Sequence, residues 1–307
     1  MLEGGGDKGA YQVGAIRGLV EAMDPRESQY DVVSGVSIGA INAVGLSLFK
    51  KGDEDAATKW MIEFWHNLSA DVVYSNWSGW IIEGAFWKTG LYNNTRFVDF
   101  LKEYVERDTI HRKVVVGATN AKNGTFVRFT EQIGINDLMY DAVRASSAFP
   151  GFFQAVNYNN MTLIDGGVLI NLDIAGAIER CKEITSNEEN MIIDIVMCSG
   201  DKLDDADVAN FNSIQMLKRY TEISTFQKTM VWITQGVANF PEVNFRYIVA
   251  PQGSISSEWI PIGFKQKEIN SLIKLGREDG ISAVKEGEGK RLSKLLKHYK
   301  LSANGAL

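Results

Sequence analysis

Histidine and cysteine are scarce in this chain of 307 residues, and their scarcity excludes several classes of chemistry. The two cysteines, Cys181 and Cys198, are too few for a disulfide framework and lack the spacing of a metal site. The three histidines, His66, His111 and His298, are scattered along the sequence, which argues against a histidine-rich metal centre. We therefore expect neither a metal nor another cofactor.

Excess positive charge and long apolar runs are also missing. A net charge of -6 and a pI near 5.3 argue against a nucleic-acid-binding protein, which would normally present a basic face. No apolar run reaches the roughly 20 residues needed to cross a bilayer, so we expect no transmembrane segment. A hydrophobic content of 45% and mixed charges at 23% instead predict a folded chain with a sizeable core.

The segment ahead of the first motif is short, because only three residues precede a glycine-rich loop that begins at Gly4. Such loops normally follow a full strand, so we expect the N-terminus to be truncated and any signal peptide to be missing with it. Five N-glycosylation patterns begin at Asn67, Asn76, Asn93, Asn123 and Asn160. The localisation is therefore unknown, between a cytoplasmic or peripheral-membrane protein and a secretory one.

Helix-like and strand-like segments alternate along the chain, which is typical of an α/β fold with a mostly parallel sheet covered on both faces. A catalytic domain is expected over residues 1–200, and a C-terminal α/β extension, packed on the same unit, over 201–307. The expected strands are 30–34, 113–118, 125–130, 161–164, 191–198 and 243–250. The expected helices are 10–23, 38–50, 137–148, 173–181, 214–235 and a single final helix from about 265.

The sharpest motif lies between an expected strand and an expected helix and consists of Gly35, Val36, Ser37, Ile38 and Gly39. This Gly-x-Ser-x-Gly pattern is typical of a nucleophile elbow, in which a serine sits on a strained turn and small flanking residues relieve crowding. An ordinary turn containing serine is the alternative, since the pattern arises by chance in about one such chain in six. The elbow alone therefore only suggests a nucleophilic serine.

A glycine-rich loop that enters a helix forms the second motif, and it consists of Gly4, Gly5, Gly6, Asp7, Lys8 and Gly9. Consecutive glycines allow backbone N–H groups to converge, and the helix N-terminus adds positive potential. The loop could therefore form an oxyanion hole or a phosphate cradle, and it also matches the dinucleotide-binding pattern Gly-x-Gly-x-x-Gly.

The third motif is Asp165-Gly166-Gly167 at the end of an expected strand. In isolation it indicates a turn. A serine hydroxyl needs a base to accept its proton, and a carboxylate within hydrogen-bond reach can do this where no histidine is suitably placed. We therefore expect Ser37 Oγ to lie within hydrogen-bonding distance of Asp165.

In this order the three motifs resemble the patatin-like phospholipases, and GVSIGAIN at 35–42 and ASSAFPGFF at 145–153 extend the resemblance. It covers about residues 4–171 and implies a three-layer α/β/α patatin-like fold with a Ser-Asp dyad. By this resemblance Ser37 is the nucleophile, Asp165 is the base, and the amides of Gly5 and Gly6 hold the oxyanion. One departure is Asp173, which stands where the family often has proline; aspartate also favours a helix start.

The resemblance implies a carboxylic ester hydrolase that cleaves fatty-acyl esters of phospholipids or other acyl lipids through an acyl-Ser37 intermediate. Its substrate would lie at a membrane or micelle surface. The head group, acyl position, chain length and oligomeric state do not follow from the sequence.

Two other functions remain open. An α/β-hydrolase esterase or a Ser-His acyltransferase would need a histidine, and His298, the only one after Asp165, lies in a lysine-rich terminal helix. A non-enzymatic lipid- or nucleotide-binding module would use the glycine loop but leave Ser37 and Asp165 unexplained. Five of the seven tryptophans lie within 53–112, where we expect mainly core residues, with a role at a lipid surface as the alternative.

Overall fold

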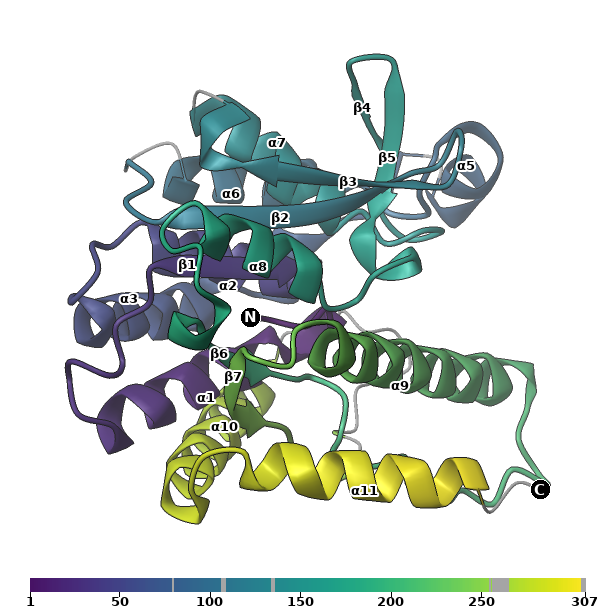
Figure 1. Cartoon of the computed structure of the whole chain (residues 1–307). Coiled ribbons are helices and arrows are strands. Elements are labelled where there is room, and N and C mark those ends of the chain that lie inside the picture. The colour runs from purple at the N-terminus through teal and green to yellow at the C-terminus, as the bar shows by residue number, and fades with distance from the viewer. Residues whose placement is uncertain (79, 106–108, 134–135, 254, 256–264, 305–307) are drawn as a thin grey trace.

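The structure of the protein, a computed structural model, describes residues 1–78, 80–105, 109–133, 136–253, 255 and 265–304 (Figure 1). Its larger sheet is mixed. Strand β1 (Val32–Val36) is parallel to β2 (Lys113–Asn120), whereas β3 (Thr125–Thr130) and β5 (Met161–Asp165) are antiparallel to β2. The short β4 (Val156–Tyr158) is antiparallel to β5. The α/β class is therefore confirmed, but the expectation of a mostly parallel sheet is wrong.

Tight turns explain two of the three antiparallel pairs, β2 with β3 and β4 with β5. Strand β3 returns directly beside β2 through a short turn that follows Asn120, and its register pairs Asn120 with Thr125. Strands β4 and β5 are joined at Asn159 and Asn160, whose φ angles are 43° and 60°. Asparagine is among the residues that tolerate positive φ, which a tight hairpin turn requires. Hairpins pair strands antiparallel, whereas the sequence prediction assumed helical crossovers.

A second, parallel pair of strands, β6 (Ile192–Val196) and β7 (Asn244–Val249), lies beside the first sheet. The two are joined through Leu2, which forms parallel bridges to both Gly35 and Val196. Its amide donates to Ser34 O at 2.8 Å, and the amide of Glu3 donates to Val196 O at 3.1 Å. The chain therefore enters the glycine loop from a position between two strands, where its backbone is fixed on both sides.

Register along β2 decides where the ends of two other strands meet. Strand β1 pairs with the first part of β2 and ends with Val36 opposite Gly117. Strand β5 pairs with the last part of β2 and ends with Asp165 opposite Ala118. Because β3 lines the other edge of β2 over both parts, β1 and β5 share one edge and run toward each other. Their C-terminal ends therefore meet.

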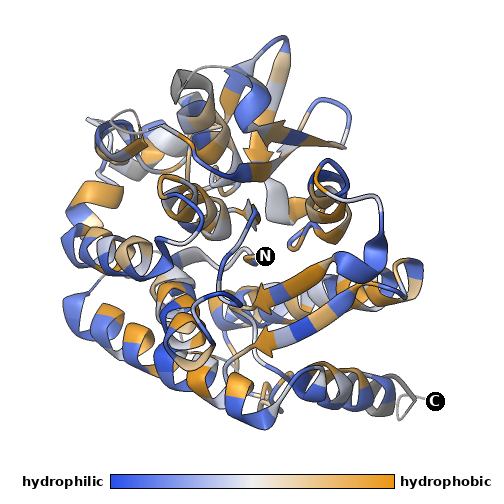
Figure 2. Ribbon diagram, turned by 60° about the vertical axis from the view of Figure 1, so that its left-hand side comes forward, coloured by the Kyte–Doolittle hydropathy of each residue, from blue (hydrophilic) through white to orange (hydrophobic). Residues whose placement is uncertain are grey.

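Helices lie on both faces of this sheet. In Figure 1, α8 (Ile174–Lys182) lies in front of β1 and β2 and α2 (Ile38–Ser47) lies behind them. The outer helices alternate between hydrophobic and hydrophilic residues along their length (Figure 2). The other helices are α1 (Gly9–Ala22), α3 (Glu54–Asn67), α4 (Ala70–Val73), α5 (Trp80–Trp87), α6 (Thr95–Val105), α7 (Asn136–Ser146), α9 (Ser213–Asn239), α10 (Gln266–Glu286) and α11 (Lys290–Asn304). Short 3₁₀ turns are η1 (Gly6–Lys8), η2 (Glu131–Ile133), η3 (Gly166–Val168) and η4 (Glu188–Asn190).

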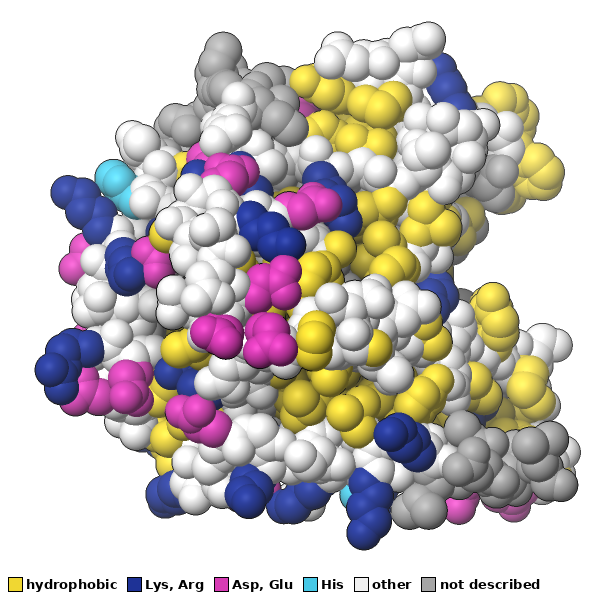
Figure 3. Space-filling view, in the orientation of Figure 1, with side chains coloured by type: hydrophobic (Ala, Val, Ile, Leu, Met, Phe, Trp, Pro, Cys, Tyr) yellow, Lys and Arg dark blue, Asp and Glu magenta, His cyan; other side chains and the backbone are white. Residues whose placement is uncertain are grey.

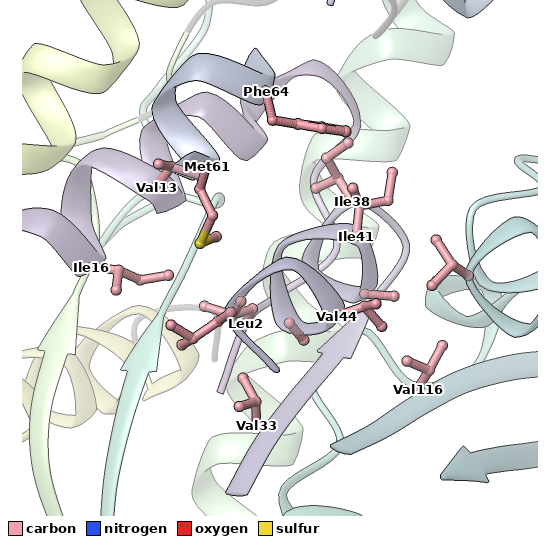
Figure 4. Packing of buried hydrophobic residues seen from close by; sticks show 14 of the residues in the cluster. Leu2, Val13, Ile16, Val33, Ile38, Ile41, Val44, Met61, Phe64 and Val116 are labelled. Atoms are coloured by element: carbon pink, nitrogen blue, oxygen red, sulfur yellow. The ribbon is translucent and has the colours of Figure 1, made fainter. Parts of the chain in front are cut away.

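The main core packs around α2, which connects the elbow to the interior. Ile38, Ile41 and Val44 of this helix are buried and lie among side chains from α3 and β2, as Figure 4 shows for Phe64 and Val116. Burial of these apolar side chains stabilises the elbow helix by roughly 1.5–3 kcal/mol for each fully buried residue. The position of Ser37 is therefore set by the packing of the helix that follows it.

Two further expectations were imprecise. The single final helix is in fact two helices, α10 and α11, because the chain breaks at Gly287, whose φ of 98° a residue with a side chain rarely adopts. The aromatic segment divides between interior and surface. Trp65 is fully buried, whereas Trp80 and Trp87 are 68% and 74% exposed. The core interpretation therefore holds for only part of that segment.

Candidate active site

Ser37 occupies a strained turn between β1 and α2. Its φ of 55° is positive, which is uncommon for a residue other than glycine. The flanking glycines allow the close packing that this turn imposes, since a Cβ on Gly35 would lie 2.1 Å from Gly39 O. A Cβ on Gly39 would lie 2.5 Å from Leu2 O. The elbow therefore has the geometry of a nucleophile elbow, with a partly accessible serine on a constrained backbone.

Asp165 lies directly against Ser37. The hydroxyl of Ser37 donates a hydrogen bond of 2.6 Å to Asp165 Oδ2. The other carboxylate oxygen, Oδ1, accepts a hydrogen bond of 2.7 Å from the amide of Gly167. Since one oxygen is held by the turn, the second oxygen points at the serine with little freedom to rotate. Both residues of the expected pair are thus brought together, and the neighbouring Gly166 packs against Gly117 O.

The electrostatics of Asp165 favour proton exchange near neutral pH. Burial raises the pKa of its carboxyl to about 6. The hydrogen bonds from Ser37 and Gly167, and then the positive charge of Lys228, act in the opposite direction on this pKa. At pH 7 the group is mostly ionised and able to accept a proton, and its affinity for that proton is higher than that of an ordinary aspartate.

Ser146, at the end of α7, holds the elbow backbone and was not among the residues predicted for the site. Its hydroxyl accepts a hydrogen bond of 2.8 Å from the amide of Ser37 and donates one of 2.5 Å to Gly117 O. Ser146 is fully buried, so these bonds are shielded from water. The signal was present in the segment ASSAFPGFF, but its role required the three-dimensional contact.

The glycine loop runs beside Ser37. A Cβ on Gly4 would lie 3.2 Å from Ser37 Cβ, but the Gly4 amide donates to Asn171 O at 3.0 Å and is committed there. Gly5 and Gly6, like Ser37, are partly accessible and stand at the start of η1, where leading N–H groups have no acceptor within the turn. Both amides are therefore candidates for an oxyanion site.

Glu3, which directly precedes the glycine loop, supports it through hydrogen bonds, and the sequence prediction missed this residue. Its fully buried carboxylate accepts hydrogen bonds from the amides of Cys198 at 2.5 Å and Ser199 at 2.8 Å. Ser199 Oγ, Thr229 Oγ1 and Asn171 Nδ2 also donate to it. A buried carboxylate satisfied by several donors is a rigid support. An acidic residue beside the loop was its only signal in the sequence.

The rest of the loop leads into α1 and faces the core. Asp7 is buried in η1, and Lys8 is half-buried. The carbonyl of Gly9 accepts a hydrogen bond of 2.9 Å from Asn42 Nδ2, and the indole of Trp65 donates to Asn42 Oδ1 at 2.9 Å. This buried polar chain ties the end of the loop to α2 and α3. Asp173, the departure from the family pattern, caps α8 by accepting from Gly176 N at 3.0 Å.

The histidine-dependent alternatives find no support. His66, His111 and His298 are all exposed, and among the residues that the structure describes none of them contacts Ser37 through a hydrogen bond. No group of three or more His, Cys, Asp or Glu side chains that could hold a metal occurs within the described ranges. In the same part of the chain, no helix combines the length and apolarity needed to cross a membrane.

Exposed apolar side chains occur on α5 and directly after the Asp165 motif. On α5, Trp80, Phe86 and Trp87 are between 68% and 77% exposed. Figure 3 shows hydrophobic side chains on both sides of a hollow between α5 and α9. Val168 and Leu169, which follow the Asp165 motif, are 40% and 36% exposed. An apolar surface of this extent is typical of an interaction site for lipid or protein.

Comparison with known proteins identifies a family and several relatives of this chain. The family model for patatin-like phospholipase matches residues 1–178. Calcium-independent phospholipase A2-gamma of Rattus norvegicus is 28% identical over 243 residues, which is 71% of this chain and 30% of the relative. The human protein of the same name is 29% identical over 207 residues, or 59% of this chain and 25% of the relative.

Two more distant similarities complete the comparison. Lysophospholipase NTE1 of Meyerozyma guilliermondii is 27% identical over 185 residues, covering 57% of this chain and 11% of the relative. The crystal structure of VipD from Legionella pneumophila aligns with 94% of this chain and 66% of that chain at a TM-score of 0.45 and 13% identity. The chain spans less than a third of the length of the curated relatives named here.

Proposed function

Because the chain belongs to the patatin-like phospholipase family, we propose that it is a lipid acyl hydrolase with Ser37 as nucleophile and Asp165 as general base. The observation that carries this proposal is the 2.6 Å hydrogen bond from Ser37 Oγ to Asp165 Oδ2. A serine on a strained elbow, hydrogen-bonded to a buried carboxylate, is equipped for attack on an acyl carbonyl.

The first half of the reaction acylates the serine. Ser37 Oγ attacks the ester carbonyl carbon as Asp165 Oδ2 accepts the hydroxyl proton, and the carbonyl oxygen becomes an oxyanion. The amides of Gly5 and Gly6 donate hydrogen bonds to that oxygen. When the tetrahedral intermediate collapses, the C–O bond to the leaving alcohol breaks and Asp165 returns its proton to the departing oxygen. The product is an acyl-Ser37 ester and a free alcohol.

The second half releases the fatty acid. Asp165 accepts a proton from a water molecule, whose oxygen attacks the acyl carbonyl through the same oxyanion site. The bond to Ser37 Oγ breaks, and the proton held by Asp165 passes to the serine. The dyad is then restored, and no redox change or metal enters the balance.

The substrate that we propose is a phospholipid or lysophospholipid presented at a membrane or micelle surface. The relatives are named as a calcium-independent phospholipase A2 and a lysophospholipase, which supports this class of substrate. The exposed Phe86 and Trp87 on α5 and Leu217 and Tyr220 on α9 give the molecule apolar surface that could enter a lipid interface. By the same analogy we expect activity without added calcium.

We propose that the chain consists of a patatin-like catalytic domain at residues 1–200 and a C-terminal extension at 201–307. The helices on both faces of the mixed sheet support a three-layer α/β/α arrangement. Strand β7 pairs with β6, and helix α10 packs against α1, so the extension shares its sheet and core with the catalytic part.

Hydrolysis of p-nitrophenyl butyrate and of phosphatidylcholine vesicles, each in the presence of EGTA, tests this function. We expect activity in the wild type, and a loss of at least about 100-fold in both Ser37→Ala and Asp165→Asn. Matched controls are Ser271→Ala and Asp205→Asn, since both residues are exposed and lie in the extension. Equal activity of the dyad variants and the wild type would overturn the proposal.

A further inference from the structure

Helix α9 places a lysine against the turn that carries the proposed base. Lys228 Nζ donates to Gly167 O and to Val168 O, both at 3.1 Å. This lysine lies 50 residues beyond the part of the chain that the family model matches, which ends at residue 178. The motifs of the N-terminal part therefore did not point to it.

Gly167 forms hydrogen bonds with both Lys228 and Asp165 and so connects the two residues. Gly167 donates its amide to Asp165 Oδ1 at 2.7 Å and accepts from Lys228 at its carbonyl. The turn of η3 is thus held at both ends, by the carboxylate on one side and by the ammonium group on the other. Loss of the ammonium group would leave two carbonyls without these donors and free the turn to move.

The positive charge of Lys228 also acts on Asp165 directly. Among the described residues, Lys228 is the charged side chain that acts on Asp165. The other neighbours of Asp165 are neutral: the Ser37 hydroxyl, the Gly167 amide, Ala118 on β2 and the carbonyl of Ala148 after α7. Burial lowers the pKa of Lys228 and the charge of Asp165 raises it. A positive charge here stabilises the ionised carboxylate.

The next residue on α9 contacts the other half of the site. Thr229 Oγ1 donates to Glu3 Oε1, the carboxylate that supports the glycine loop. Asn171 Nδ2, which also donates to Glu3, lies 3.4 Å from Thr229 Oγ1. Consecutive residues of one helix therefore fix the turn of the base and the loop of the oxyanion site.

We propose that Lys228 is a positioning residue for the general base, holding the η3 turn beneath Asp165 and supplying the positive charge that stabilises its carboxylate. This inference rests on the proposed function of Ser37 and Asp165. It assigns part of the active site to the C-terminal extension, so the segment matched by the family would be incomplete without α9.

The pH dependence of kcat/KM on p-nitrophenyl butyrate tests the role. In Lys228→Met we expect kcat to fall at least about tenfold with little change in KM, and the acid limb to move about half a unit upward. Lys228→Arg keeps the charge and the donors and should recover most of kcat and the wild-type acid limb. Lys274→Met removes an equal charge from the surface of α10, where the lysine is 78% exposed, and should leave the profile unchanged.

Head-group recognition is the competing role for this lysine. It predicts that Lys228→Met impairs hydrolysis of phosphatidylcholine vesicles through KM while p-nitrophenyl butyrate, which carries no phosphate, is cleaved normally. That outcome, or an unchanged acid limb in Lys228→Met, would overturn the positioning role while leaving the Ser37 and Asp165 proposal intact.

A titration that needs no turnover separates the two proposals. Carboxyl carbon NMR of the labelled protein, with the Asp165 signal assigned through Asp165→Asn, reports the pKa of this group directly. We expect the pKa of Asp165 in Lys228→Met to exceed that in the wild type, even if no ester is hydrolysed by either protein. Equal pKa values in the two proteins would refute the electrostatic part of the inference.

Discussion

Ser37 and Asp165 are 128 positions apart in the sequence and are joined by a hydrogen bond of 2.6 Å. Their meeting follows from the register of β2, which places Val36 opposite Gly117 and Asp165 opposite Ala118. Strands β1 and β5 approach from opposite directions along one edge, so the residue after one strand meets the last residue of the other. The mixed sheet is therefore the reason that a strand-end serine and a strand-end aspartate form one site.

Replacing Asp165 by asparagine should stabilise the fold at neutral pH. The pKa of Asp165 is raised from 3.8 to about 6 by burial, so its ionisation costs stability that grows as pH rises from about 4 and is complete above about 6. At pH 8 we expect the unfolding free energy of Asp165→Asn, measured by urea denaturation, to exceed that of the wild type by up to about 3 kcal/mol. The advantage should disappear at pH 4, and a constant difference across this range would contradict the account.

Ser146→Ala should loosen the elbow. The variant removes the acceptor of the Ser37 amide and the donor to Gly117 O, both inside the core. We expect about 2 kcal/mol lower unfolding free energy and about a tenfold lower kcat, with KM little changed. Ser147→Ala is the matched control, because Ser147 Oγ donates only within its own helix region, to Val143 O and Arg144 O. Similar behaviour of the two variants would remove Ser146 from the site.

Gly5→Ala should displace the oxyanion loop. A Cβ at this position would lie 2.3 Å from Cys198 Cβ and 2.5 Å from Cys198 Sγ, too close for either atom. We expect a loss of about 100-fold in kcat, the size associated with one oxyanion donor. Because the clash is with one side chain, Gly5→Ala combined with Cys198→Gly should recover part of the activity relative to Gly5→Ala alone. No recovery, with Cys198→Gly itself active, would place the defect elsewhere.

Phe86 and Trp87 should contribute to lipid binding but not to chemistry. Both side chains are more than 70% exposed, at 77% and 74%. The double replacement by alanine should weaken binding to phosphatidylcholine vesicles in a sedimentation assay by at least about tenfold. Hydrolysis of p-nitrophenyl butyrate should not change, and Ile184→Ala, at a residue 52% exposed after α8, should bind as wild type. Unchanged vesicle binding in the double variant would exclude α5 as a membrane contact.

Short-range patterns in the sequence were informative where local chemistry decides the structure. The strand at 125–130, the helix that follows Ser37 and the turn after Asp165 all occur as expected. The direction of the strands was mispredicted because it depends on tight turns such as Asn159-Asn160, which make β4 and β5 a hairpin. The final helix was predicted as one because the break at Gly287 is a local exception within an amphipathic pattern.

The supporting residues of the site could not be predicted from the sequence, because each acts across a long separation. Glu3 accepts from residues that lie more than 190 positions away, and Lys228 contacts Gly167 across 61 positions. Neither belongs to a motif, and a single buried glutamate or half-buried lysine has no periodic signature. Motifs indicated the reacting groups, whereas the groups that orient them became visible only in the packed structure.

The most direct test of the central claim is covalent labelling of the intact chain with a fluorophosphonate, followed by peptide mass spectrometry. The account predicts one adduct on Ser37, formed rapidly by the wild type at pH 8, at least about 100-fold more slowly by Asp165→Asn, and not at all by Ser37→Ala. An adduct on another residue, or equal labelling rates for the wild type and Asp165→Asn, would contradict a dyad of Ser37 and Asp165.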